Sequence, residues 1–96
     1  MKASKAIKKT FKSQVKILVT NGIQLIKDEC NKGNYRAKID LLVDKSTLSY
    51  RINEQVKNTF ESLGYKLGST NSCDNRYYLN VFWDIEELNK EDFISS

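Results

Sequence analysis

The chain has 96 residues, a length typical of one domain, and we expect residues 1–96 to form that single domain. Hydrophobic residues make up 40% and charged residues 29%, a balance that favours a folded core over a disordered chain. Histidine is absent and there are two cysteines, which excludes histidine-based general acid–base catalysis and a four-ligand zinc site. We therefore expect a protein with no enzymatic activity, no metal and no cofactor.

The net charge is +4, and it is divided unevenly along the chain. Residues 1–45 carry eleven basic and four acidic side chains, whereas residues 46–96 carry five basic and eight acidic ones. A basic half of this kind favours an anionic partner, such as a nucleic acid, a nucleotide or an acidic protein.

The cellular location is inferred from the cysteines and the apolar runs. No signal-peptide pattern is recognisable, and no apolar run is long enough to span a membrane. We therefore expect a cytoplasmic protein that does not bind membranes and in which Cys30 and Cys73 are free thiols.

The first predicted element is a long amphipathic helix over residues 4–31. Spacings of three and four residues place one set of side chains on a single stripe: Ile7, Phe11, Val15, Leu18, Gly22, Leu25 and Ile26. Gly33 stands where a left-handed C-cap would end this helix. Gly22 is a weak point, because glycine costs about 1 kcal/mol relative to alanine inside a helix.

Alternating apolar and polar side chains then predict a strand over residues 35–43. A second helix begins at Ser46 or Thr47, either of which can act as its N-cap. This helix continues to about Leu63, and Gly64 ends it.

Two further strands are predicted at residues 65–69 and 76–83, separated by a turn-rich segment. Asp84 and Glu87 have the spacing of a capping box. We therefore expect residues 84–96 to form a short acidic helix or tail.

The order helix–strand–helix–strand–strand predicts an α+β fold. We expect the last two strands to form a hairpin and the first strand to pair with the last. This gives a three-stranded, mainly antiparallel sheet of order 1-3-2, with both helices on one face in a two-layer α-β-α-β-β sandwich. In the alternative, strands one and two are neighbours, run parallel and are joined by a right-handed crossover.

The length of the first helix predicts self-association. A helix of about 26 residues is about 39 Å long, whereas a compact domain of this size is about 32 Å across. The helix therefore either overhangs the body or breaks near Gly22. An overhang leaves Ile7 and Phe11 with nothing in their own chain to pack on, so we expect them to form an interface in a homo-oligomer.

The side of this helix opposite the apolar stripe carries a group of lysines: Lys5, Lys8, Lys9, Lys12, Lys16 and Lys27. Residues 1–16 contain no acid, although solvated helix faces usually mix both signs. We interpret Lys9, Lys12 and Lys16 as contacts to an anionic ligand, with Arg36 adding to the same charge. The alternatives are a plain solvated helix face and a helix that lies on a membrane surface.

The strand over residues 76–83 carries a second candidate site. Arg76, Tyr78 and Phe82 lie on the face opposite Leu79 and Val81. If the helices cover one face only, these side chains form an open platform on which nucleobases can stack. The alternatives are a second small core and a dimer interface between two sheets.

The remaining polar groups favour no chemistry. The acidic side chains Asp40, Asp44, Asp84, Glu86 and Glu87 match no catalytic or metal-binding spacing, and helix capping explains most of them. Neither cysteine has a base of the right type beside it, so we assign no catalytic residue.

Three features close the elements in a recognisable way: Lys32-Gly33 after the first helix, Leu63-Gly64-Tyr65 after the second, and Phe82-Trp83 at the end of the last strand. In these features the chain resembles the small accessory proteins of tailed bacteriophages. Such proteins inhibit host enzymes, block or sequester the signals of host defence, or sit in the virion. The resemblance implies a binding protein without enzymatic activity in the host cytoplasm, and it carries over no functional residue.

We therefore expect a small phage-type binding protein that antagonises a host process such as host defence. It would do so by sequestering an anionic target, either a nucleotide signal or a nucleic acid. The alternative is an inhibitor that binds a host enzyme or a nucleic-acid-binding protein, or a structural component of the virion.

Overall fold

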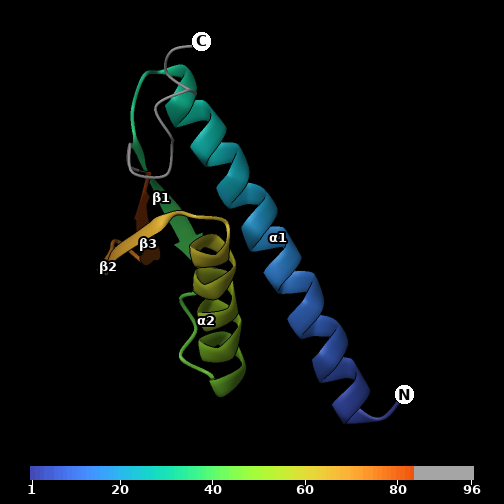
Figure 1. Cartoon of the computed structure of the whole chain (residues 1–96). Coiled ribbons are helices and arrows are strands. Elements are labelled where there is room, and N and C mark those ends of the chain that lie inside the picture. Colours follow the sequence, from blue (N-terminus) through green and yellow to red (C-terminus); the bar gives the residue numbers. More distant parts are fainter. Residues whose placement is uncertain (84–96) are drawn as a thin grey trace.

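A computed structural model describes residues 1–83 of the chain as two helices and three strands (Figure 1). The elements in chain order are α1 (Ala3–Asn31), β1 (Arg36–Leu41), α2 (Thr47–Ser62), β2 (Lys66–Cys73) and β3 (Arg76–Phe82). The predicted order of elements is confirmed. The acidic helix or tail predicted at residues 84–96 lies outside the described residues.

The three strands form one sheet of order β1-β3-β2, in which both neighbouring pairs are antiparallel. This confirms the predicted topology, and the parallel alternative is wrong. β3 is the central strand because it pairs with β1 on one side and, through a tight hairpin, with β2 on the other. Asp74 and Asn75 form the turn with φ angles of 49° and 66°, a left-handed conformation that these residue types tolerate well.

Two strand boundaries differ from the prediction by more than one residue. β2 continues to Cys73, four residues past the predicted end at Ser69, because β3 offers it a partner along the whole hairpin. A register shift between Leu67 and Thr70 interrupts the regular pairing of this strand. β1 ends at Leu41, before the predicted end at Val43, because the chain leaves the sheet there.

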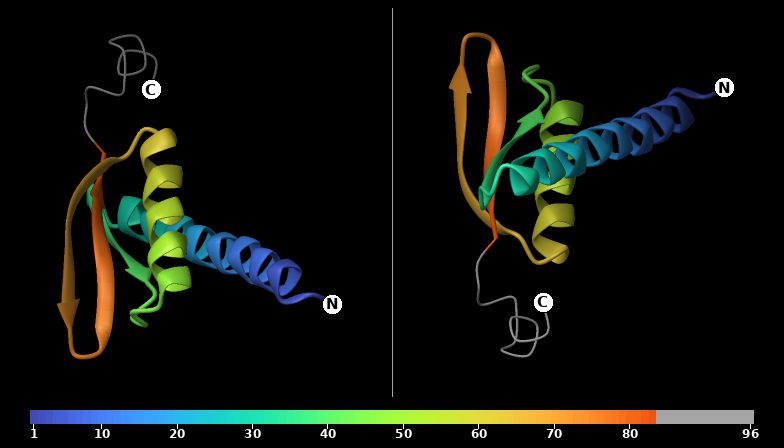
Figure 2. Two further views of the ribbon diagram at one scale, coloured as in Figure 1. Left: turned by 90° about the horizontal axis from the view of Figure 1, so that it is seen from below. Right: turned by 90° about the horizontal axis from the view of Figure 1, so that it is seen from above.

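Both helices pack on the same face of the sheet, so the molecule has two layers (Figure 2). Every second residue of β1 is buried, and Leu79 and Val81 of β3 are buried beside them. The buried side chains that form the core are Leu18, Ile26, Ala37, Ile39, Leu41, Ile52, Val56, Phe60, Leu79 and Val81. Within residues 1–83 no helix lies over the opposite face of the sheet (Figure 2).

Side-chain hydrogen bonds hold α2 at its N-terminal end. Ser46 is the N-cap, and its side chain accepts a hydrogen bond from the backbone N–H of Ser49. The buried Asn53 accepts from the backbone N–H of Leu42 at 2.9 Å and donates to the Leu42 carbonyl at 3.0 Å. These two bonds replace the sheet partner that Leu42 loses where β1 ends.

Gly22 lets α1 approach the rest of the core closely, and the helix does not break there. A Cβ placed on this residue would lie 2.6 Å from Cζ of Phe60 and 2.9 Å from Cγ2 of Ile39. Only glycine fits at this crossing, so the residue that weakens the helix locally is required by the packing around it. Of the two predicted alternatives, an overhang and a break near Gly22, the structure has the unbroken helix.

The first turns of α1 extend beyond both the sheet and α2 (Figures 1 and 2). Twenty-nine residues make a helix about 43 Å long, and residues 3–10 are exposed on every side. Ile7 is 52% exposed, as predicted for an overhang. Phe11, in contrast, is half-buried and packs against the core, so the expectation that it has no partner in its own chain is wrong. The apolar stripe reaches the core one turn earlier than predicted.

None of the helices within residues 1–83 is both long and apolar enough to cross a membrane.

The uncovered sheet face as a candidate ligand-binding site

The structure divides the predicted site residues between two surfaces. The first surface, which we call the sheet platform, is on the uncovered face and consists of Arg36, Lys38, Arg76, Tyr78, Asn80 and Phe82. It contains four of the predicted residues. The second surface, which we call the lysine row, lies on α1 and consists of Lys5, Lys9, Lys12 and Lys16. It contains the other three predicted charge contacts.

The antiparallel register explains how the platform is assembled. Residues paired across β1 and β3 point to the same face, and the pairs are Arg36 with Phe82, Lys38 with Asn80, and Asp40 with Tyr78. Each aromatic ring of the platform therefore stands beside a charged side chain of β1. Lys38 places its Nζ 5.1 Å from the centre of the Tyr78 ring, a cation–π contact.

Arg76 is held by Asp40, which lies on the same face of the sheet. Its Nη2 donates to Oδ1 of Asp40 at 2.7 Å, and both side chains are largely exposed. This hydrogen bond and the charge of the Asp40 carboxylate raise the pKa of Arg76 above its ordinary value. Arg76 is therefore charged and already paired with Asp40, whereas Arg36 and Lys38 make no ion pair with any described residue.

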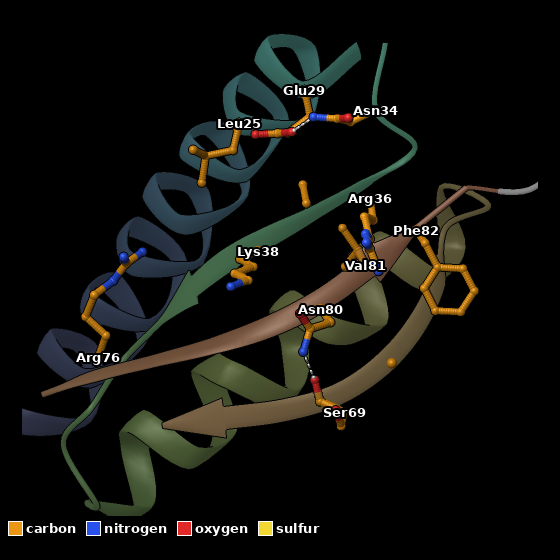
Figure 3. A pocket seen from close by; sticks show the side chains of 12 residues that line it. Leu25, Glu29, Asn34, Arg36, Lys38, Ser69, Arg76, Asn80, Val81 and Phe82 are labelled. Carbon is orange, nitrogen blue, oxygen red and sulfur yellow. Dashed lines mark hydrogen bonds between the residues drawn. The ribbon is translucent and has the colours of Figure 1, made fainter. Parts of the chain in front are cut away.

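An open groove of about 910 Å³ runs along this part of the molecule (Figure 3). The platform contributes five lining residues to it: Arg36, Lys38, Arg76, Asn80 and Phe82. Tyr78 is not among the lining residues. At the α1 end Glu29 also lines the groove, where it accepts a hydrogen bond from Asn34 at 2.6 Å and lies 3.7 Å from the ammonium of Lys32. This acid is already engaged by its neighbours, so it opposes an anionic ligand less than a free carboxylate would.

Gly68 and Ser69 of β2 line the groove beside Asn80 and Phe82. Asn80 donates from Nδ2 to the carbonyl oxygen of Ser69 at 2.8 Å, next to the register shift of this strand (Figure 3). A Cβ on Gly68 would lie 3.4 Å from Cβ of Asn80 and 3.5 Å from Cε1 of Phe82. The missing side chain therefore leaves room beside the Phe82 ring.

The sequence reasoning missed Lys38, Asn80, Ser69 and Gly68. The alternation of polar and apolar residues in β1 places Lys38 on the same face as Arg36, and this pattern was sufficient to predict Lys38 as a ligand-binding residue beside Arg36. The roles of Asn80 and Ser69 depend on how β2 is paired with β3, which no local pattern reveals.

The lysine row lies away from the platform. All four lysines are exposed, and within residues 1–83 their side chains make no hydrogen bond or ion pair. α1 packs on the covered face of the sheet, whereas Arg36 lies on the opposite, uncovered face (Figure 2). The predicted contacts Lys9, Lys12 and Lys16 therefore cannot join Arg36 in one compact site.

Within residues 1–83 the carboxylates do not gather into a catalytic or metal site. Asp40 pairs with Arg76, and Asp44 accepts hydrogen bonds from the Ser46 backbone and the Ser49 hydroxyl. Hydrogen bonding by the Ser46 side chain, followed by that of the Ser49 side chain, lowers the pKa of Asp44 below its ordinary value. No group of three or more possible metal ligands occurs in the described part of the chain. Asp84, Glu86 and Glu87 lie beyond it.

The two cysteines, Cys30 and Cys73, are free thiols and are exposed.

Comparison of the chain with protein-family models, with curated proteins and with solved structures gave no match.

Proposed function

We propose that this protein is a binding protein that holds single-stranded nucleic acid on the sheet platform. Arg36 and Lys38 contact phosphates, and the rings of Phe82 and Tyr78 stack with bases. The observation that carries the proposal is the composition of the uncovered face, where exposed cations flank two aromatic side chains on the central strand.

The charge of the platform favours an anion over a second copy of the sheet. Among the described residues, Arg36, Lys38 and Arg76 share the platform face with one acid, Asp40. Packing two such faces together around a two-fold axis would bring like charges into contact, which is unfavourable. A phosphate backbone instead meets the cations with the opposite sign and releases its counterions.

Base stacking is stronger than the contact that it would replace. Lys38 lies over the Tyr78 ring at 5.1 Å, and an exposed cation–π contact is worth about 0.5–1 kcal/mol. Stacking of a base on an aromatic side chain is worth about 1–3 kcal/mol. A base can therefore displace the ammonium of Lys38, which then becomes available to a neighbouring phosphate.

The shape of the groove favours a single-stranded nucleic acid over a free nucleotide. Sites for small ligands enclose most of the ligand surface and orient it with a few well-placed polar groups. The cations here are exposed, and no described buried side-chain atom lacks a hydrogen-bond partner. An open groove of this kind suits a polymer that passes across it. If the protein is encoded by a phage, it would antagonise a host process by occupying single-stranded nucleic acid.

Fluorescence anisotropy with a labelled single-stranded oligonucleotide tests the proposal, with a free nucleotide as the second probe. We expect salt-dependent binding of the oligonucleotide and weak binding of the nucleotide. The double variant Arg36→Gln/Lys38→Gln should lower the slope of log affinity against log salt by about 1.4, at about 0.7 for each lost contact to a single strand. Tyr78→Ala should weaken binding roughly fivefold or more.

The control variants remove the same residue types from the helical side. Arg51→Gln/Lys45→Gln removes two exposed cations, and Tyr50→Ala removes a tyrosine that is 66% exposed. Neither control should change the affinity. Equal losses from the platform variants and the controls, or tight binding of the free nucleotide alone, would contradict the proposal.

A further inference from the structure

We infer that the lysine row of α1 is a second binding surface, which docks along the phosphate backbone of a nucleic-acid duplex. This inference rests on the overhang of α1 and is independent of the sheet platform. Its residues are Lys5, Lys9, Lys12 and Lys16.

The N-terminal part of α1 concentrates one sign of charge. Residues 1–27 contain seven lysines and no acidic residue. The first turn of the helix has no acidic side chain and no side-chain cap, so lysines stand where the helix dipole is already positive. This arrangement is unfavourable in isolation, and a polyanion relieves it.

The four lysines form a straight row. They follow one another at intervals of four, three and four residues, which places them on one side of the helix. They span about 16 Å along the helix axis. A duplex is a stiff polyanion with one charge for about every 1.7 Å of its axis, so a rigid row of cations can meet several phosphates at once.

The overhang keeps this row accessible. Residues 3–10 are exposed on every side, and Lys12 and Lys16 are exposed as well. Figure 2 shows that the N-terminal part of α1 projects beyond the sheet and α2, so a rigid partner can approach it there.

Two other occupants fit less well. A second copy would bring another acid-free row of lysines to the interface, and like charges repel. A membrane-bound helix inserts a broad apolar face, but Phe11, Val15 and Leu18 of this stripe already pack in or against the core. Ile7 is the large apolar side chain of the stripe that stays exposed, at 52%.

The test measures binding of the full chain to a duplex of about 20 base pairs over a range of salt concentrations. The quadruple variant K5Q/K9Q/K12Q/K16Q should lower the slope of log affinity against log salt by up to about 3.6, at about 0.9 for each duplex contact. Glutamine is a good helix former, so circular dichroism should show the same helix content. The corresponding four Lys→Arg changes should retain the binding.

Two further measurements separate this surface from the platform and from a membrane. The variant R36Q/K38Q/R76Q should bind the duplex with the slope of the parent chain. Vesicles of equal parts phosphatidylcholine and phosphatidylserine should not bind the parent chain at the salt concentration where the duplex does. An unchanged duplex slope in the quadruple lysine variant, loss of duplex binding in the platform variant alone, or binding to vesicles without binding to the duplex would overturn the inference.

Discussion

Replacing Gly22 by alanine tests the closest packing contact in the fold. A Cβ at this position would lie 2.6 Å from Cζ of Phe60 and 2.9 Å from Cγ2 of Ile39. Phe60 is fully buried, and its ring meets the Tyr65 ring edge-on with the centres 5.9 Å apart, so it cannot move aside freely. The substitution therefore forces α1 away from the core.

The expected change is the difference between two opposing effects. Overpacking of a core costs about 1–3 kcal/mol, whereas replacing glycine by alanine inside a helix contributes about 1 kcal/mol of stability. The free energy of unfolding should therefore fall by up to about 2 kcal/mol. In a domain of this size each kcal/mol shifts the Tm by roughly 4–8 °C, so Gly22→Ala should lower the Tm by up to roughly 16 °C.

Thermal and urea unfolding followed by circular dichroism measure this change. The control is Asn21→Ala, on the neighbouring exposed residue of α1, which should raise stability by less than about 1 kcal/mol through helix propensity. The larger Gly22→Val should be more destabilising than Gly22→Ala. If Gly22→Ala were as stable as Asn21→Ala, α1 would not cross the core at this glycine, and the reasoning would be refuted.

Four further predictions concern stability and assembly. Asn53→Ala should lower the free energy of unfolding by about 1–3 kcal/mol, because it leaves the backbone N–H and carbonyl of Leu42 without partners; chemical unfolding measures it. Ser46→Ala should lower it by about 1 kcal/mol through loss of the N-cap, with Ser46→Asp as the variant that keeps a cap. The pKa of the Asp44 carboxyl is lower in the folded state than in the unfolded state, so its ionised form stabilises the fold. This contribution is complete above the unfolded pKa, near 4, and is lost as the pH falls through the folded pKa. Asp44→Asn should remove this part of the loss of stability in acid, which unfolding curves at several pH values measure. Self-association through the exposed apolar side of the overhang should appear as a mass that rises with concentration in light scattering and should be abolished by Ile7→Glu, and a strict monomer at every concentration would contradict it.

The local pattern of the chain was sufficient to predict the order of elements and the sheet topology. The apolar stripe of α2 and the alternation in β1 and β3 each repeat with the period of their own structure. Gly33 and Gly64 follow the two helices with φ angles of 83° and 96°, as a left-handed C-cap requires. Short connections and the hairpin then left few ways to arrange three strands.

Other features depend on partners that are distant in sequence. The segment 70–73 has no strand pattern of its own and is part of β2 because β3 pairs with it. Gly22 is unfavourable for a helix taken alone, yet the approach of Phe60 requires it. Phe11 is half-buried because the core extends far enough along α1 to reach it. In each case the deciding contact joins two elements.

The candidate site divides in the same way. The local sequence pattern places the cations of β1 and the aromatic residues Tyr78 and Phe82 of β3 at alternate positions of their strands, and it places lysines on one side of a long helix. The tertiary contacts determine which of them lie together, because the strand register sets Arg36 beside Phe82 and Lys38 beside Asn80. The tertiary structure also separates the lysine row from the platform, because α1 packs on the covered face of the sheet and the platform lies on the other face (Figure 2).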